Sequence, residues 1–348
     1  MLRSSVRAFL PAKAPLAWVR AEYAADASDR SVWDGLAGLG VVGLLVGEEH
    51  GGAGMGMVDA AVVLEELGRA VCPVPYVSSA IGAVALADAE LRPSLADGSA
   101  IGTLAIFEAG ARYDWRAPAT TAARAGDGFR LDGDKIHVAD AGSADVVLVT
   151  ALDDDGRLGV FATEQFEVEA TPTVDGSRKQ GRVALRGAAA RRVDDGNAEI
   201  SVARTLDRIG VAAVVDGVGA AQRALELSVE YAKEREQFDK PIGAFQAIQH
   251  LCADMLRTVE LGRAAGYYAC WAIDDASPEE AHRASTLARA FAADAFPQVG
   301  GTAIQVFGGI GFTWEHDIHL YYKRLLTVAQ ALGTASDHLE ELATIAID

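Results

Sequence analysis

The hydrophobic pattern of this chain changes period twice, and this constrains its fold more than any other feature. Up to about residue 100, apolar residues recur at helical spacing, as in Ala60–Gly68. From 101 to 200, short apolar runs alternate with turn residues, which is typical of strands. From 201 to 348 helical spacing returns. The pattern predicts an α+β fold with an N-terminal helical domain (1–100), a middle β domain (101–200) and a C-terminal helical domain (201–348).

The middle domain carries two hairpin signals. Asp132-Gly133 separates the apolar runs 129–131 and 136–138, and Asp153-Asp154-Asp155-Gly156 separates the runs 146–149 and 160–162. Asp and Gly tolerate the positive φ that a tight turn between two strands requires. Both signals therefore predict antiparallel pairing of the flanking strands.

The C-terminal domain contains a clear helix start at Ser277-Pro278-Glu279-Glu280. Ser277 can cap the helix, proline suits the first turn, and Glu280 stands at the third position of a capping box. We expect this helix to run to Phe307 and to end at Gly308-Gly309.

Charge and composition exclude several classes of function. The 348 residues carry a net charge of -18, which argues against a nucleic-acid partner because phosphate contacts need clustered Lys and Arg. The apolar runs fall short of the roughly 20 residues of a membrane helix, and the N-terminus lacks the pattern of a signal peptide. Three scattered cysteines fit a reducing compartment, so we expect a cytoplasmic protein without a membrane partner.

Two motifs in the C-terminal domain carry the functional signal. The first is Arg235-Glu236-Gln237-Phe238-Asp239-Lys240-Pro241-Ile242-Gly243, and the second is Gln305-Val306-Phe307-Gly308-Gly309-Ile310-Gly311-Phe312-Thr313. Together with the segments 33–52 and 64–68, they resemble the acyl-CoA dehydrogenase family over nearly the whole chain. The resemblance implies that family's fold, with an N-terminal helical domain, a middle antiparallel β domain and a C-terminal four-helix bundle.

The resemblance also implies FAD as the cofactor and assigns residues to it. In the family, the two motifs reach across a subunit interface and hold the cofactor of the neighbouring subunit. A diphosphate needs cations or N–H donors, which an arginine fork offers, and a glycine lets the backbone approach closely. The positions implied here as cofactor contacts are Arg235, Gln237, Phe238, Ile248, Gln305 and Gly309.

The other half of a flavin site is eroded in this chain. The family's loop and strand beside the flavin ring match Phe107–Asp114 and Ile136–Asp140, where the usual indole and hydroxyl are both absent. Removal of the α-proton of an acyl-CoA needs a carboxylate base. The family's two base positions are occupied by Leu332 and Ile209, and Gly210 replaces the usual arginine after the second. Asp207, read as a helix-start residue, and Asp216 are the nearby carboxylates.

These departures resemble the short, base-lacking subunit of heterotetrameric (α2β2) bacterial acyl-CoA dehydrogenases, such as those that degrade steroid side chains. The resemblance implies an acyl-CoA substrate, a second acyl-CoA dehydrogenase subunit and an electron-transfer flavoprotein as acceptor. Two alternatives stay open. One is a self-sufficient homotetramer with a relocated carboxylate base, and the other is a flavin-free acyl-CoA-binding or scaffold protein.

Two further patterns invite a functional interpretation and have a simpler one. Gly217-Val218-Gly219 approaches a dinucleotide fingerprint, but no strand precedes it, so we expect close helix packing. His316, Asp317 and His319 could suggest a metal, but they match an ordinary stretch of the family, and we expect surface or interface polar groups.

Overall fold

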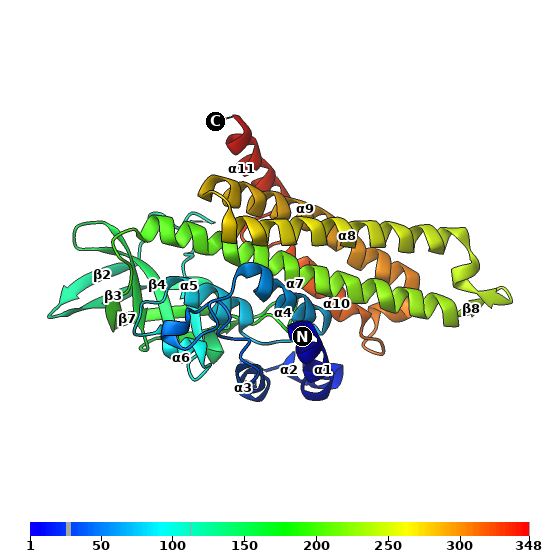
Figure 1. Cartoon of the computed structure of the whole chain (residues 1–348), viewed down its shortest axis with the longest axis horizontal. Helices are drawn as coiled ribbons and strands as arrows, with labels where there is room; N and C mark the ends of the chain where they lie inside the picture. The colour runs from blue at the N-terminus through cyan, green and yellow to red at the C-terminus, as the bar shows by residue number, and fades with distance from the viewer. Residues whose placement is uncertain (26–28, 112, 348) are drawn as a thin grey trace. The chain divides into compact units, whose positions relative to one another are not determined.

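The structure is a computed structural model that describes residues 1–25, 29–111 and 113–347 (Figure 1). The chain packs into two compact units, each built from separate stretches. One unit consists of Met1–Val19, Ala61–Cys72 and the chain from Gly210 onward, and the other of Arg20–Ala60 and Pro73–Ile209. The division into 1–100, 101–200 and 201–348 stays a prediction. No helix in the described part of the chain combines the length and the apolar character that crossing a membrane requires.

Long helices dominate the C-terminal half of the chain. They are α7 (Ala198–Glu234), α8 (Gln246–Asp275), α9 (Pro278–Phe307), α10 (Ile318–Val328) and α11 (Ala335–Ile347). The short strands β8 (Glu236–Gln237) and β9 (Lys240–Pro241) and a 3-10 turn (Ile242–Ala244) connect α7 to α8, and a second 3-10 segment (Gly308–Phe312) follows α9. The predicted helix α9 is confirmed, because the side chain of Ser277 accepts a hydrogen bond from the backbone N–H of Glu280, and the helix ends at Gly308.

Four of these helices meet around Phe296 of α9, whose side chain is fully buried. Gly217 of α7 packs directly on this ring, since a Cβ there would lie 2.7 Å from it and 3.0 Å from Val328 of α10. Gly262 of α8 approaches the opposite edge of the ring equally closely. Glycines thus let α7, α8, α9 and α10 close around one aromatic side chain, and the expected helical bundle is present.

The N-terminal helices are shorter. They are α1 (Leu2–Lys13), α2 (Leu16–Glu22), α3 (Arg30–Gly38), α4 (Met57–Arg69), α5 (Val84–Leu86) and α6 (Arg92–Ala96), with a 3-10 turn at Glu48–His50 and a π-helix at Tyr76–Ala83. Helices α4 and α7 cross closely at Gly68 and Gly219. A Cβ on Gly219 would stand 1.9 Å from the carbonyl oxygen of Glu65, and one on Gly68 would stand 1.8 Å from that of Asp216. The Gly217-Val218-Gly219 pattern is therefore a helix-crossing site, as expected.

The unit that contains Pro73–Ile209 holds one seven-stranded sheet. Its strands are β1 (Gly102–Ala105), β2 (Thr121–Ala125), β3 (Gly128–Ala139), β4 (Val146–Asp153), β5 (Leu158–Thr163), β6 (Glu167–Thr171) and β7 (Gln180–Arg192). Most pairs are antiparallel, but β4 runs parallel to β1 and to β2, so the sheet is mixed where an antiparallel one was expected. Strand β4 also pairs with β5, which closes the order β4-β2-β3-β7-β5 on itself.

One of the two predicted hairpins is confirmed and the other is wrong. Strands β4 and β5 pair antiparallel around Asp153–Gly156 as predicted. Asp132-Gly133 makes no turn, because β3 continues through it with a register shift against β7 at this point. The turn lies earlier, at Gly126 with φ 63°, where β2 and β3 meet. Gly133 instead adopts φ 157°, which is nearly extended.

Candidate functional site

A two-residue β-hairpin projects between α7 and α8 and presents the first motif (Figure 1). Gln237 pairs with Lys240, and the two turn residues Phe238 and Asp239 have φ values of 55° and 62°. A bulky side chain is disfavoured in this left-handed region, where turns prefer Gly or Asn. Phe238 is nevertheless 85% exposed, and its ring makes an edge contact with Phe245, at 6.1 Å between centroids. The turn therefore holds an apolar ring out in solvent at a conformational cost.

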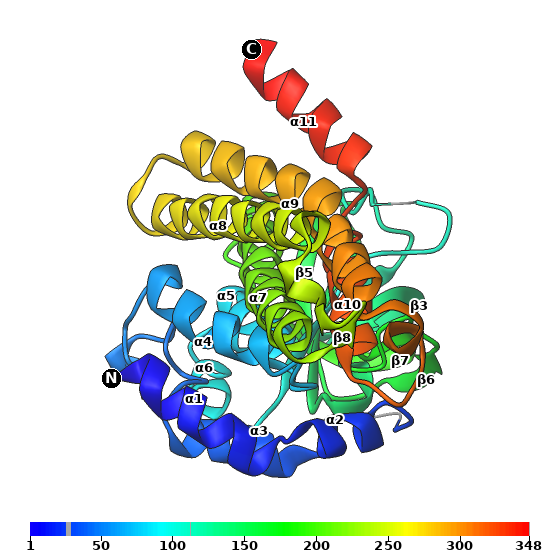
Figure 2. The ribbon, with the colours of Figure 1, turned by 90° about the vertical axis from the view of Figure 1, so that its right-hand side faces the viewer.

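Aromatic stacking brings the two motifs to the same end of the bundle (Figure 2). Tyr231, in the last turn of α7, stacks on Phe307, the last residue of α9, with ring centroids 4.4 Å apart. The ring of His316 also packs against Phe307, with ring centroids 4.3 Å apart. The hairpin and the glycines after α9 are thereby held close together, although about 70 residues separate them in the sequence.

The residues predicted to contact a cofactor are mostly exposed at this end. Arg235 and Gln305 are exposed, and Ile248 is half-buried in the first turn of α8. Within the described ranges, no carboxylate forms an ion pair with Arg235. Gly309 faces open space, since a Cβ added there would meet nothing within 4 Å. The amide of Gln237 donates to the Glu236 carbonyl at 2.8 Å.

Sequence reasoning missed several aromatic and basic neighbours of these residues. Phe312 is 77% exposed and Trp314 is 57% exposed, and the ammonium group of Lys323 lies 4.5 Å from the Trp314 ring centre. Lys240 lies 4.3 Å from the ring centre of Phe245. Phe312 already stands within the second motif, and Trp314 follows directly after it, so the aromatic spacing there was the signal. An unpaired arginine, exposed rings and accessible backbone suit a diphosphate joined to a flat aromatic group.

The two segments predicted for the flavin ring lie side by side in the sheet unit. The backbone N–H of Ile136 donates to the carbonyl of Phe107 at 2.9 Å. Beneath them the fully buried Lys135 donates to Glu108 at 2.7 Å. Burial lowers the pKa of Lys135 to about 8, although Glu108 opposes this shift. Burial alone would raise the pKa of Glu108, but the hydrogen bond from Lys135 keeps it below its usual range.

The side chains that face outward here do not replace the missing ring contacts. His137, in the segment where the indole and hydroxyl were expected, has φ 54°, and its ring nitrogen lies 3.2 Å from the amide oxygen of Gln180. Phe107 and Tyr113 pack edge to face, 5.8 Å apart. Arg112, in the same loop, lies outside the described residues. The backbone of the two segments is paired, while the expected indole and hydroxyl are absent.

Neither base position carries a carboxylate. Ile209 is half-buried in α7, and its Cδ1 would lie 3.2 Å from a Cβ added to Gly82. Leu332 has φ 61° directly before Gly333. Asp207 is buried in the interior of α7, which already begins at Ala198, so the expectation of a helix start at Asp207 is wrong.

Asp216 is part of a buried ion pair. One nitrogen of Arg324 lies 2.9 Å from each of its carboxylate oxygens, and both side chains are inaccessible to solvent. A carboxylate held in this way cannot reach a substrate.

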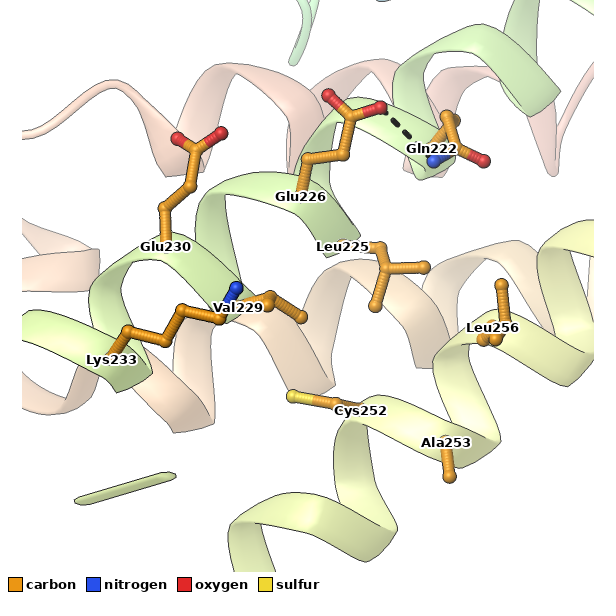
Figure 3. A pocket seen from close by; sticks show the side chains of 9 residues that line it. All are labelled: Gln222, Leu225, Glu226, Val229, Glu230, Lys233, Cys252, Ala253 and Leu256. Carbon is orange, nitrogen blue, oxygen red and sulfur yellow. Dashed lines mark hydrogen bonds between the residues drawn. The ribbon is translucent and has the colours of Figure 1, made fainter. Parts of the chain in front are cut away.

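A pocket of about 430 Å³ opens between α7 and α8 (Figure 3). It is lined by Gln222, Leu225, Glu226, Val229, Glu230 and Lys233 of α7 and by Cys252, Ala253 and Leu256 of α8. Arg223 lies 3.1 Å from both Glu226 and Glu230, and Arg69 and Gln222 also donate to Glu226. Burial would raise the pKa of Glu226, but the hydrogen bond and charge of Arg69 lower it to about 2. Both carboxylates are thus engaged by cations.

The histidines after the second motif have structural partners. His316 stacks on Phe307 and accepts from the backbone N–H of Ile318 at 3.1 Å, and the buried His319 packs against Trp314. In the described part of the chain, no three His, Cys, Asp or Glu side chains are placed to hold a metal ion.

Comparisons with known proteins agree with this fold. Residues 1–90 match the model of the acyl-CoA dehydrogenase N-terminal domain, and residues 194–346 match that of the C-terminal domain. The acyl-CoA dehydrogenase IpdE2 of Mycobacterium tuberculosis is 34% identical over 349 residues, which cover 98% of this chain and 95% of that protein.

Two solved structures are similar over almost their full length. A variant of the Tcur3481-Tcur3483 steroid ACAD has a TM-score of 0.89 and 32% identity, covering 99% of this chain and 96% of that one. The ChsE4-ChsE5 complex from Mycobacterium tuberculosis has a TM-score of 0.88 and 28% identity, covering 100% of this chain and 96% of that one. Because two domain models and a full-length relative agree, the chain belongs to the acyl-CoA dehydrogenase family.

Proposed function

We propose that this chain is a subunit of an FAD-dependent acyl-CoA dehydrogenase that completes the flavin site of a partner subunit in an α2β2 complex. The observation that carries the proposal is that two side chains close in sequence are both exposed: Arg235, which forms no ion pair with any carboxylate in the described part of the chain, and Phe238. In a chain with a net charge of -18, a cation left without a carboxylate fits an anionic ligand that comes from outside.

The residues at this end of the bundle fit the diphosphate and adenosine of FAD. Arg235 would hold diphosphate oxygens through its planar fork, and Phe238 would cover a flat apolar face. Gln305 and Gly309 would border the same group, where the open backbone at Gly309 allows close approach. Gln237 and Ile248 would flank it. When bound, FAD supplies the hydride acceptor for α,β-dehydrogenation of an acyl-CoA thioester.

The proton-abstracting step is assigned to the partner subunit. Leu332 and Ile209 cannot accept a proton, and the buried pair with Arg324 removes Asp216 from consideration. The similarity to subunits in the ChsE4-ChsE5 complex and to a steroid ACAD supports a second acyl-CoA dehydrogenase subunit and a bulky acyl-CoA substrate. Electrons would pass from the flavin to an electron-transfer flavoprotein.

The proposal is tested by Arg235→Ala in the complex of this chain with its partner acyl-CoA dehydrogenase subunit, found by co-expression with candidate subunits. Loss of a charge-assisted contact of about 1.5–3 kcal/mol should weaken FAD binding roughly ten- to hundredfold. Arg283→Ala is the matched control, because Arg283 is an exposed arginine near the opposite end of α9 that pairs with Glu280. Equal FAD affinity in the Arg235→Ala and wild-type complexes would show that this end of the bundle does not contact the cofactor.

A further inference from the structure

An arginine side chain crosses α7 where that helix has a glycine. A Cβ added to Gly210 would lie 2.5 Å from Cδ of Arg289, which belongs to α9. The side chain of Arg289 is only 8% exposed. Any larger residue at position 210 would therefore have to displace the arginine, so the glycine and the buried arginine depend on each other.

The buried guanidinium of Arg289 reaches from α9 to α11. Its Nη2 donates to Oγ1 of Thr286, one turn earlier in α9, at 2.9 Å and to Oε2 of Glu341 at 3.2 Å. The other oxygen of Glu341 lies 3.4 Å from Nε2 of His282, also on α9. Glu341 is thus the point at which α11 contacts both Arg289 and His282 of α9.

The same cluster extends to the turn that precedes α11. Nδ1 of the buried His338 lies 4.0 Å from Glu341, and its Cε1 would lie 3.0 Å from a Cβ on Gly333. Leu332 and Gly333 have φ values of 61° and 144°, so this turn is held in an unusual backbone conformation. A continuous set of contacts therefore links Gly210 to Gly333.

Helix α11 has little else to hold it. It leaves the bundle in both views (Figures 1 and 2), and His338 is the only buried side chain between Ala335 and Ile345. A helix of 13 residues is marginally stable in water without tertiary contacts. Its position must then depend strongly on the contacts that it makes with α9.

We propose that Arg289 is a positioning residue that fixes α11 and the Leu332–Gly333 turn through Glu341. Its side chain has room to cross α7 because residue 210 is a glycine. This assignment concerns the isolated chain and does not depend on flavin or on a partner subunit. These contacts connect two places where the family's base is missing. Gly210 directly follows Ile209, which occupies one base position, and the Leu332–Gly333 turn contains Leu332, which occupies the other.

Amide hydrogen exchange of the purified full-length chain tests the proposal. Arg289→Ala should speed exchange of the α11 amides at least about tenfold while α8 keeps its protection. Arg289→Lys should retain part of the protection, and Arg289→Met, of similar length without charge, should not. Arg283→Ala, on an exposed arginine of the same helix, should leave α11 unchanged.

The role of Gly210 is tested by a double-mutant cycle. Gly210→Ala alone should also speed α11 exchange, and adding it to Arg289→Ala should have little further effect, because both changes act through one contact. Unchanged α11 exchange in Arg289→Ala, or effects of the two changes that simply multiply, would overturn the proposal. If Arg289→Ala does not fold, Glu341→Gln takes its place with the same expected and contradicting results.

Discussion

Arg324 and Asp216 form an ion pair that is closed to solvent within the helical unit. A single guanidinium nitrogen lies 2.9 Å from both carboxylate oxygens, and the neighbouring nitrogen points to the carbonyl of Cys72 at 3.5 Å. The backbone carbonyl of Asp216 also blocks Gly68, where a Cβ would stand 1.8 Å from it. Asp216 therefore serves packing, and no freedom remains for it to act on a substrate.

Asp216→Asn should destabilise the chain by about 3–5 kcal/mol, because it leaves the buried guanidinium of Arg324 without its counter-charge. Urea unfolding of the purified chain measures this loss. Asp254→Asn is the control, since Asp254 pairs with Arg257 on the exposed surface and should change stability by less than about 0.5 kcal/mol. Similar effects of the two variants would mean that the buried pair is not structural.

Gly219→Ala should destabilise the chain by at least about 1–3 kcal/mol, since its Cβ would overlap the Glu65 carbonyl and force α4 and α7 apart. Gly301→Ala in α9 is the matched change, because a Cβ there meets nothing within 4 Å. It should stabilise the chain by about 0.4–1 kcal/mol through reduced freedom of the unfolded state. Thermal melts of both variants decide this, and a stabilising Gly219→Ala would contradict the helix-crossing role.

Phe238→Gly should leave the hairpin folded or make it slightly more stable, because glycine accepts the left-handed turn without strain. The same change should lower FAD retention in the complex. Asp239→Gly relaxes the neighbouring turn residue and keeps the ring, so it should retain the flavin. FAD content after gel filtration compares them. Loss of flavin from both variants alike would assign the effect to the turn and not to the ring.

Glu226→Gln should cost about 1–2 kcal/mol at pH 7, because the carboxylate is held by Arg69 and Arg223 while remaining partly exposed. Its folded pKa of about 2 lies below the unfolded value, so this stabilisation is present above about pH 4.5 and is lost as the pH falls towards 2. Denaturant midpoints between pH 7 and 3 should show the difference from wild type shrinking. Glu230→Gln, at the more exposed end of the cluster, should have a smaller effect. A difference that stays constant with pH would rule out the ion pair as its source.

The sequence predicted the elements better than the contacts between them. The cap at Ser277 and the end at Gly308 are local signals, and both were correct. The prediction of a turn at Asp132-Gly133 was wrong because the chain turns earlier, at Gly126, and β3 then continues through Asp132-Gly133. The crossing of Arg289 over Gly210 and the stacking of Tyr231 on Phe307 join residues far apart in the chain, which periodicity cannot reveal. The exposure of the Phe238 ring could also not be predicted from the sequence.

The central claim is that this chain completes a flavin site that another subunit mainly encloses. The most direct measurement is the visible absorption spectrum of the chain purified alone and after co-expression with candidate partner acyl-CoA dehydrogenase subunits. We expect colourless protein alone and a yellow complex that is reduced by acyl-CoA. A yellow chain that oxidises acyl-CoA by itself would contradict the claim.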